Sequence, residues 1–495
     1  MRQRFEQQTS LGITPISEVK LPLKSRDELP QVLMALQYIF VTPELNEKIF
    51  SLLENKICSD KKKTGRKGMD LWHIIVLAIV RQALDTNWDR LECIANYDGL
   101  TRQILGVHAN QFNEEDELEF SYQSIIDNVS VINEELLMEI NTLVATHGRQ
   151  LLKKKENEEI KLKTDSFVLE TNVHFPTDLN LLWDSLRKGL DTTSAIKALS
   201  NLQGWRKINC IRSQTKSIFR ATSQQVFRGK DESQKKQKVN EYINVAKALH
   251  KRFVEIIINP PSTVLPETLV KLIIDLMRYN DFIKKFIDQI ERRLIKDEKI
   301  DASEKIYSIF ETHTEWISKG KLNRSVELGH LLLITTDQHH FIVDYKVMEG
   351  EKDAPQIKPL SERIQKLYPN KTIYSHSFDK GFFSKENLQI LRQGKVENII
   401  LPKKGKLNKG EKERESTKEF KTLRNAHSAV ESNINMLEHH GLNRCPDKGL
   451  HGYKRYVGLS VLAYNLHILG NHLKAEARKK EALLQKQRER YRQAA

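Results

Sequence analysis

The chain has 495 residues, more than one ordinary hydrophobic core accommodates, so two or three domains are expected. Its 80 lysines and arginines outnumber 65 aspartates and glutamates, for a net charge of +15 that favours a nucleic-acid partner. Four cysteines without paired spacing argue against a disulfide framework and a zinc ribbon. No apolar run suits a signal peptide or a bilayer span, so we expect a cytoplasmic protein without a membrane partner.

The first 150 residues are predicted to be all helical. Apolar residues recur at helical spacing in Gln31–Phe40, Leu45–Ile57 and Leu71–Leu84. A lysine-rich stretch, residues 61–67, precedes the third of these segments. Short helices behind a basic run are typical of a helix-turn-helix DNA reader, but a helical bundle with a solvated charged loop explains the same pattern.

A strand pattern follows the helical region. Ile160, Leu162, Phe167 and Leu169 alternate as in a β-strand, and Asp165 lies among them. A buried aspartate is costly unless it is paired or binds a metal, whereas an exposed one on a strand needs no such explanation. Asp165 is therefore a candidate metal ligand whose assignment depends on other residues.

Residues 181–319 are predicted to form a largely helical insertion after this strand. Within it, Gly204 to Asn240 carries ten basic residues against two acidic ones, a net charge of +8. Trp205, Phe219 and Phe227 are interleaved with these charges and offer rings that can stack on bases. Such a segment is either a DNA-binding face or a solvated helix face.

Strand and helix patterns alternate again after residue 320. Strands are predicted at Leu331–Ile334, Phe341–Val343, Thr372–Ser375 and Asn398–Leu401, and helices at Ile357–Tyr368 and Lys385–Arg392. Asp379 and Gly381 follow the third strand, at a strand end where α/β proteins place functional groups.

One amphipathic helix is predicted from Phe420 to Leu437, because its apolar residues recur every three or four positions. Arg424, His427 and Glu431 share the adjoining face, so Glu431 can reach a pocket in the sheet. On spacing alone, a surface Arg–His–Glu cluster fits better. Paired zinc-site spacing is missing, so non-ligand roles are predicted for His439, His440, Cys445 and His451.

In these segments the chain resembles the DDE transposases of bacterial insertion sequences, most closely the ISNCY group. Three stretches carry the match: Lys163-Thr164-Asp165-Ser166 with Glu170 to Asp178, His376 to Phe382, and His427 to Asn435. Supporting stretches are Gly65 to Met69, Lys319 to Lys321 with Val326 to Gly329, and Gly441 to Gly449. The resemblance covers residues 60–470 or so, and the stretches are specific only in combination.

The resemblance implies an α/β protein with an RNase H-like mixed-sheet catalytic core in residues 155–180 and 320–470. The helical insertion, 181–319, follows the first strand of that core. A helical N-terminal DNA-binding region, 1–150, precedes it, and a charged tail, 471–495, follows it.

The resemblance also implies a two-metal site. Asp165, Asp379 and Glu431 are expected to be catalytic and to hold two Mg²⁺ ions, for which Mn²⁺ can substitute. These ions activate a water or a DNA 3′-hydroxyl and stabilise the leaving oxygen, first in cleavage at the element end and then in strand transfer. Related enzymes often have a lysine seven residues after the glutamate, where this chain has Glu438.

The expected partners are double-stranded DNA, as element ends and as target, and further copies of the chain on that DNA in a nucleoid-associated complex. The expected DNA contacts are Lys63, Arg66, Arg206, Arg212, Lys216, Arg220, Lys321, Arg324, Arg424 and His427. Two alternatives stay open: a non-catalytic repressor derived from a transposase, and an RNase H-like nuclease without strand transfer. The presence of all three acids opposes the first. The helical regions favour transposition, because end recognition needs DNA-binding surface beyond the catalytic core.

Overall fold

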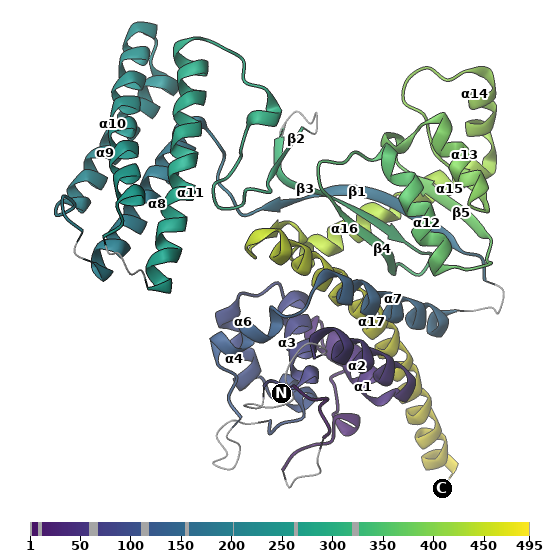
Figure 1. Cartoon of the computed structure of the whole chain (residues 1–495). Helices are drawn as coiled ribbons and strands as arrows, with labels where there is room; N and C mark the ends of the chain where they lie inside the picture. The colour runs from purple at the N-terminus through teal and green to yellow at the C-terminus, as the bar shows by residue number, and fades with distance from the viewer. Residues whose placement is uncertain are drawn as a thin grey trace. The chain divides into compact units, whose positions relative to one another are not determined.

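The computed structural model describes residues 2–7, 12–58, 68–109, 118–153, 158–200, 202–261, 266–318 and 326–494. The chain divides into two compact units (Figure 1). The first unit joins Met1–Asn172 to Ile317–Ala495, and the second is Val173–Trp316. The protein is a mixed α/β chain with a mostly helical N-terminal region and a mixed sheet of seven strands, which confirms the expected α/β class.

Helices fill the N-terminal part of the first unit. Their bounds are α1 (Leu29–Val41), α2 (Pro43–Ile57), α3 (Leu71–Ala83), α4 (Trp88–Tyr97), α5 (Gly99–Leu105), α6 (Tyr122–Val129) and α7 (Glu134–Leu152). Asn87, Asp98 and Asn133 begin α4, α5 and α7 by accepting a hydrogen bond from the backbone N–H three residues on.

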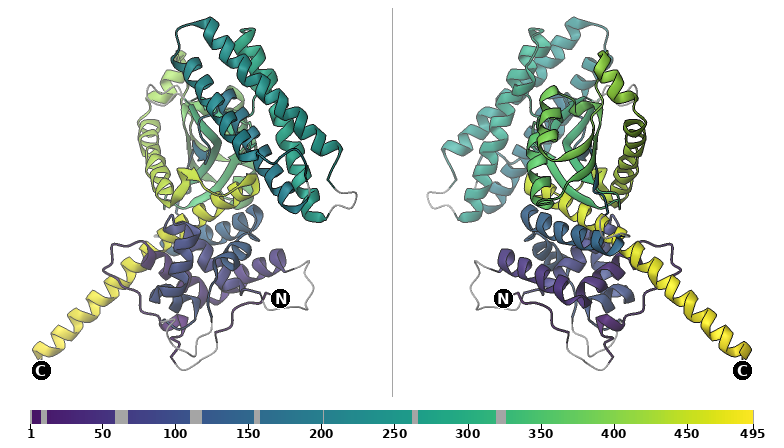
Figure 2. Two further views of the ribbon diagram at one scale, coloured as in Figure 1. Left: turned by 90° about the vertical axis from the view of Figure 1, so that its left-hand side faces the viewer. Right: turned by 90° about the vertical axis from the view of Figure 1, so that its right-hand side faces the viewer.

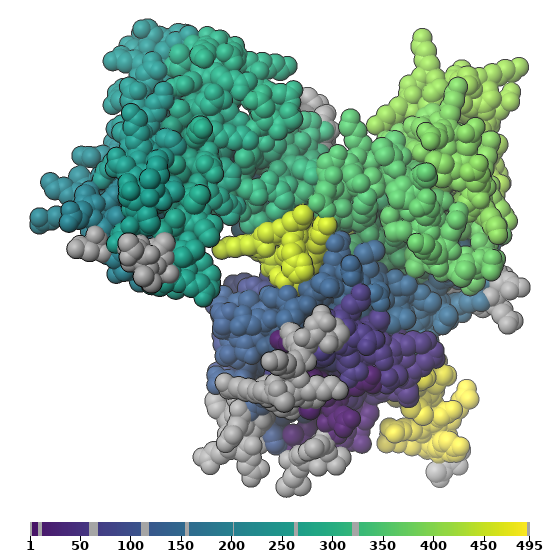
Figure 3. Space-filling view, in the orientation of Figure 1, coloured from purple at the N-terminus to yellow at the C-terminus, as the bar shows by residue number. Residues whose placement is uncertain are grey.

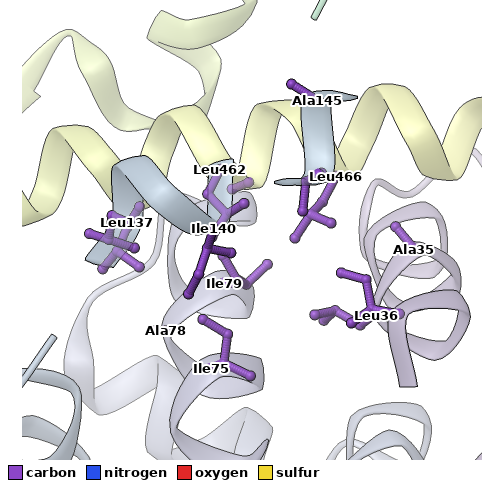
Figure 4. Packing of buried hydrophobic residues seen from close by; sticks show 14 of the residues in the cluster. Ala35, Leu36, Ile75, Ala78, Ile79, Leu137, Ile140, Ala145, Leu462 and Leu466 are labelled. Carbon is purple, nitrogen blue, oxygen red and sulfur yellow. The ribbon is translucent and has the colours of Figure 1, made fainter. Parts of the chain in front are cut away.

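Helix α3 lies at the centre of this helical bundle. All thirteen of its residues are buried. Figure 4 shows Ile75 and Ile79 of α3 close to Ile140 of α7 and Leu462 of the C-terminal helix. A helix buried on every side has no face to place in a DNA groove, so at α3 the packing favours the bundle interpretation over a DNA-reading helix.

Seven strands form the sheet of the first unit. Their bounds are β1 (Lys161–Thr171), β2 (Glu315–Ser318), β3 (Val326–Thr336), β4 (Ile342–Met348), β5 (Ile373–Phe378), β6 (Val396–Ile400) and β7 (Arg444–Cys445). The strand order is β2-β3-β1-β5-β6, with β4 also paired to β3 and β7 to β1. Strand β3 is antiparallel to both β1 and β4, whereas β5 is parallel to β1 and to β6. All five predicted strand segments overlap one of these strands.

Helices cover both faces of the sheet (Figure 1). The later helices are α12 (Ile357–Leu367), α13 (Lys385–Gln393), α14 (Lys409–Ser416), α15 (Lys418–His427), α16 (Ala429–Leu437) and α17 (Gly449–Ala494). One face of β1, with Phe167 and Leu169, packs in a cluster with Val430 of α16 and Val457 of α17. The other face, with Leu162, belongs to the cluster that holds α12 and α13 side chains.

The predicted helix from Phe420 to Leu437 is in fact two helices, α15 and α16. At the junction, the Ser428 hydroxyl donates a hydrogen bond to the Asn425 carbonyl at 2.8 Å. A serine that bonds back to its own helix competes with helix continuation. Ala426 is exposed rather than part of the buried stripe, whereas Val430 is fully buried. The break therefore gives α16 an axis independent of α15.

Helix α17 is unbroken from Gly449 to Ala494, so the expected boundary at residue 470 falls inside it. Its first half packs in the core, and every side chain from Arg478 to Arg492 is exposed. Figure 2 shows this end (yellow) extending past the other helices of the first unit.

Four long helices build the second unit: α8 (Asp178–Leu199), α9 (Ile208–Arg228), α10 (Glu232–Ile258) and α11 (Glu267–Ile290). In the space-filling view this unit (teal) presents a continuous packed surface (Figure 3). The expectation that Trp205 and Phe219 stack on bases is wrong. The Trp205 ring is buried and stacked on Phe253 at 5.6 Å between centroids, and Phe219 stacks on Trp183 at 5.6 Å. Both rings stabilise the core of this unit instead.

Candidate active site

The pairing of β1 with β5 sets two of the predicted acids side by side. These parallel strands pair Thr164 with Phe378, and the next position on each is Asp165 and Asp379. Neighbouring strands lie about 4.8 Å apart, and residues in register point to the same face. Asp379 begins a short turn over Lys380–Phe382, but its side chain caps no backbone N–H and stays available.

Glu431 comes from the helix above the same face. It lies in the first turn of α16, next to Val430, which is fully buried in the cluster that contains Phe167. Burial raises the pKa of Asp165 to about 6, and the negative charges of Asp379, Asp353 and Glu431 add to this shift. A hydrogen bond from the Ser166 N–H, at 2.8 Å, acts against this shift. The structure thus brings Asp379 and Glu431 within electrostatic reach of Asp165.

Asp353 is a fourth carboxylate at this position, and sequence reasoning missed it. The Ser166 hydroxyl donates to its Oδ1 at 2.7 Å. Its Oδ2 lies so close to Gly381 that a Cβ there would come within 2.9 Å. In the sequence, an aspartate before Ala354 and Pro355 looks like an ordinary helix start. In the structure its side chain makes no cap hydrogen bond and turns to the site instead.

His427, expected to contact DNA, lies against the sheet. Its Nδ1 is 3.0 Å from the Ser377 hydroxyl, and its Nε2 is buried without a hydrogen-bond partner. Burial lowers the pKa of His427 to about 4, with Lys163 adding to the shift and Asp379 opposing it. A neutral imidazole gives no charge to a phosphate contact, so the expected DNA role of His427 is not supported.

Hydrogen bonds between buried side chains join three strands on the other face of the sheet, opposite the acids. Thr164 Oγ1 is 2.7 Å from Thr335 Oγ1 and 2.8 Å from His376 Nε2. Burial lowers the pKa of His376 to about 3, so the ring stays neutral inside the sheet. These bonds fix the strands one residue before Asp165 and so restrict where its carboxylate can lie.

The donor set suits a hard divalent cation. Four carboxylates gather here, and in the described part of the chain Asp165, Asp353, Asp379 and Glu431 have no ion pair within 4.0 Å. Mg²⁺ prefers carboxylate oxygens. The three predicted acids do not form a set with all ligand atoms within 4.8 Å of one another, unlike a group elsewhere in the first unit. Carboxylates that are farther apart than this can still share a site with two ions, because the ions themselves lie about 3.5–4 Å apart.

Asp165→Asn should raise the melting temperature at about pH 8 in a chelator, because the carboxylate is ionised there beside other negative charges. The folded pKa of about 6 lies above the ordinary 3.8, so this group's contribution to stability is present below pH 3.8 and lost as the pH rises through 6. The variant's advantage should therefore appear between these pH values and stay constant above them. Thermal unfolding from about pH 4 to 8 checks this, and equal melting temperatures throughout would contradict it.

Adding Mg²⁺ provides the matching control for that comparison. A ligand that binds only the folded state raises its melting temperature. Mg²⁺ should therefore stabilise the wild type and leave Asp165→Asn almost unchanged.

The predicted DNA contacts fall into three groups. Outside the described residues lie Lys63, Arg66, Lys321 and Arg324. Arg206, Lys216 and Arg220 are exposed at the start of α9 or along it, and Arg424 is exposed on α15. Arg212 is half-buried, and its guanidinium forms an ion pair with the carboxylate of Asp191 in the same unit. That ion pair gives Arg212 a role in the fold and makes it a weaker candidate for DNA than its neighbours.

No family model, no curated protein and no solved structure matches this chain. Within the described residues, each helix is too short or too polar to span a lipid bilayer.

Proposed function

We propose that this chain is a DDE transposase that cuts the ends of an insertion sequence and joins them to target DNA. The observation that carries the proposal is the parallel register that sets Asp165 beside Asp379, with Glu431 over the same face. Three acids from distant stretches of the chain lie where β5 ends beside β1, and each belongs to a stretch that carries the resemblance. A helical region and a helical unit accompany the sheet, as end recognition requires.

An RNase H-like core is part of this proposal, and the sheet supports it. Asp165 lies on β1, the first strand of the sheet. If the four-residue β2 is set aside, β5 is the fourth strand in chain order, and Asp379 is the residue that follows it. Glu431 lies on a helix after the last long strand. The resemblance implies these positions, with the first acid on the first strand, the second at the end of the fourth strand and the glutamate on a later helix.

The residues of the site have distinct tasks in the proposed reaction. Asp165, Asp379 and Glu431 would hold the divalent ions, which when bound lower the pKa of the attacking hydroxyl and neutralise the leaving oxygen. Ser166 and its N–H hold the carboxylates of Asp353 and Asp165 in place. No protein nucleophile is needed, because an in-line phosphoryl transfer depends on positioning and on charge neutralisation.

The test uses labelled DNA that carries the sequences flanking the gene on either side, together with a target plasmid. With Mg²⁺, a transposase cuts at the element ends and joins their 3′-ends to the plasmid. With Ca²⁺, which accepts the same oxygens at longer distances, assembly should occur without turnover. A repressor would bind the ends and leave every strand uncut, and a nuclease would cut without joined product. Either of these last two results would overturn the proposal.

DNA binding by the second unit gives a separate prediction. Replacing Lys216 and Arg220 by glutamine should reduce the slope of log affinity against log salt by about 1 to 2, because each phosphate contact contributes about 0.9. Both side chains are exposed one turn apart on α9. Binding to labelled ends over a salt series measures the slope.

A matched control removes the same charge from other helices of the unit, through Lys251→Gln with Lys284→Gln. Both of these lysines are exposed, on α10 and α11. The control should keep the wild-type slope. If the α9 variant also keeps it, the basic segment is a solvated helix face.

A further inference from the structure

Three side chains far apart in the sequence meet in the first unit, away from the carboxylates. Glu28 stands directly before α1, His440 lies in the turn Glu438–Leu442 that follows α16, and His467 is on α17. One ligand atom from each of the three lies within 4.8 Å of the others. His440 is fully buried and His467 is 6% exposed, so this is an interior cluster.

Each imidazole of the cluster has a nitrogen without a partner. The Nδ1 atom of His440 lies 3.2 Å from the Ala83 carbonyl, which can only accept, so Nδ1 carries the hydrogen. In the neutral ring the lone pair is then on Nε2, which is buried and has no hydrogen-bond partner. The Nδ1 atom of His467 is likewise buried and unpartnered. A buried imidazole nitrogen without a hydrogen-bond partner calls for an explanation, and a bound metal ion is one.

The charges around the two rings favour a cation. The pKa of each imidazole is lowered by burial, so both rings are neutral near pH 7 and offer lone pairs. Glu28 brings a half-buried negative charge, with its Oε2 4.0 Å from His440 Nδ1. Lys474, two turns along α17 from His467, opposes a cation, but its ammonium donates to the Ser25 carbonyl at 2.6 Å.

We infer that Glu28, His440 and His467 form a binding site for a divalent cation of the zinc type. Two imidazoles and one carboxylate suit borderline metals such as Zn²⁺, whereas Mg²⁺ prefers oxygen ligands alone. Ligand atoms around tetrahedral zinc lie about 3.3 Å apart, as bonds of about 2.0–2.1 Å require. The atoms of this cluster lie within 4.8 Å of one another, so the cluster must close by up to about 1.5 Å. The Glu28 carboxylate, whose Oε2 lies near Nδ1 of His440, must also move toward Nε2. For His440 this reverses the expectation from spacing, since its partners come from other helices.

The position of the site gives the metal a structural role. The ion would tie the start of α1 and the middle of α17 to the turn that directly follows α16, the helix of Glu431. Each of these segments also packs in the core, so the ion adds to an existing contact rather than creating one. This inference does not depend on the proposed function.

Cobalt titration of the metal-stripped full chain tests the inference, in the absence of DNA and Mg²⁺. In wild type the visible absorption bands of nitrogen-ligated cobalt should saturate at one equivalent of this cobalt, apart from any Co²⁺ held by the carboxylates of the proposed catalytic site, and Zn²⁺ should displace it. His467→Gln and Glu28→Gln should each weaken binding by about tenfold or more, because each removes a ligand. With Asp165→Asn as the background, Zn²⁺ should raise the melting temperature of the chain with Glu28 and His467 intact but of neither ligand variant.

Two control variants separate this site from its surroundings. His439→Gln removes the exposed neighbour of His440 and should bind Co²⁺ as wild type does. Asp165→Asn should also bind normally, so that failure of the proposed catalytic site and failure of this one are distinguishable. Circular dichroism checks that each variant folds. If His467→Gln does not fold, the cobalt affinity of Glu28→Gln alone tests the inference. Absence of a one-to-one cobalt band in wild type, or wild-type cobalt affinity in both ligand variants, overturns the inference.

Discussion

Replacing Asp165 by asparagine should lower DNA cleavage by more than about 100-fold, because even the outer-shell partners of metal ligands are worth about 10–100-fold. The negative charges of the other three carboxylates all raise the pKa of Asp165, so each of them lies within electrostatic reach of it. The substitution keeps the size of the side chain and removes one negative oxygen. A rate measurement on labelled element ends with Mg²⁺ gives the loss directly.

Two further measurements make that result specific. DNA affinity should be unchanged in Asp165→Asn, because the proposed phosphate contacts lie elsewhere. Glu397→Gln is the matched control, since this exposed carboxylate belongs to β6 of the same sheet and is not among the acids that act on Asp165. If Asp165→Asn cuts DNA at a rate close to that of Glu397→Gln, Asp165 is not a ligand of the reacting centre.

Glu431→Gln should abolish both cleavage and strand joining, for a related reason. Glutamine has the same length but lacks the charge that a divalent ion needs. We expect a loss of at least about 100-fold, as for Asp165, because both reactions would use the same site. Gel analysis of cut and joined products from one reaction measures both steps.

Glu438→Gln is the control for that variant. Glu438 lies two turns after Glu431, is also exposed, and has no part in the electrostatics of Asp165. It should keep wild-type cleavage and joining. If joining persists in Glu431→Gln, the third acid of the site is a different residue, and Asp353 is then the first to replace.

The sequence predicted the strands well, and it singled out three acids, two of which the fold places within electrostatic reach of the third, Asp165, because strands and motifs both have local signals. Alternating apolar residues identify β1, and the stretch around each acid is long enough to carry a resemblance. Local patterns do not show which strands pair with each other in the sheet. The adjacency of Asp165 and Asp379 depends on the register of two strands that are far apart in the chain.

Other features were missed for physical reasons of the same kind. Asp353 has the local pattern of a helix start and reaches the site only through the fold. The break at Ser428 depends on one side-chain hydrogen bond that periodicity does not register. Trp205 was interpreted as a stacking platform because it lies among charges, whereas the fold buries it against Phe253. His440 lacks a paired spacing because its neighbours belong to other helices.

The most direct test of the proposed site is anomalous X-ray diffraction from a complex with element-end DNA and Mn²⁺. Manganese accepts the oxygen ligands of magnesium and scatters strongly enough to be located. We predict two peaks about 3.5–4 Å apart at the edge of the sheet, between Asp165, Asp379 and Glu431, and the loss of both peaks in Asp165→Asn. A complex with bound DNA but no manganese peak at these carboxylates would contradict the account.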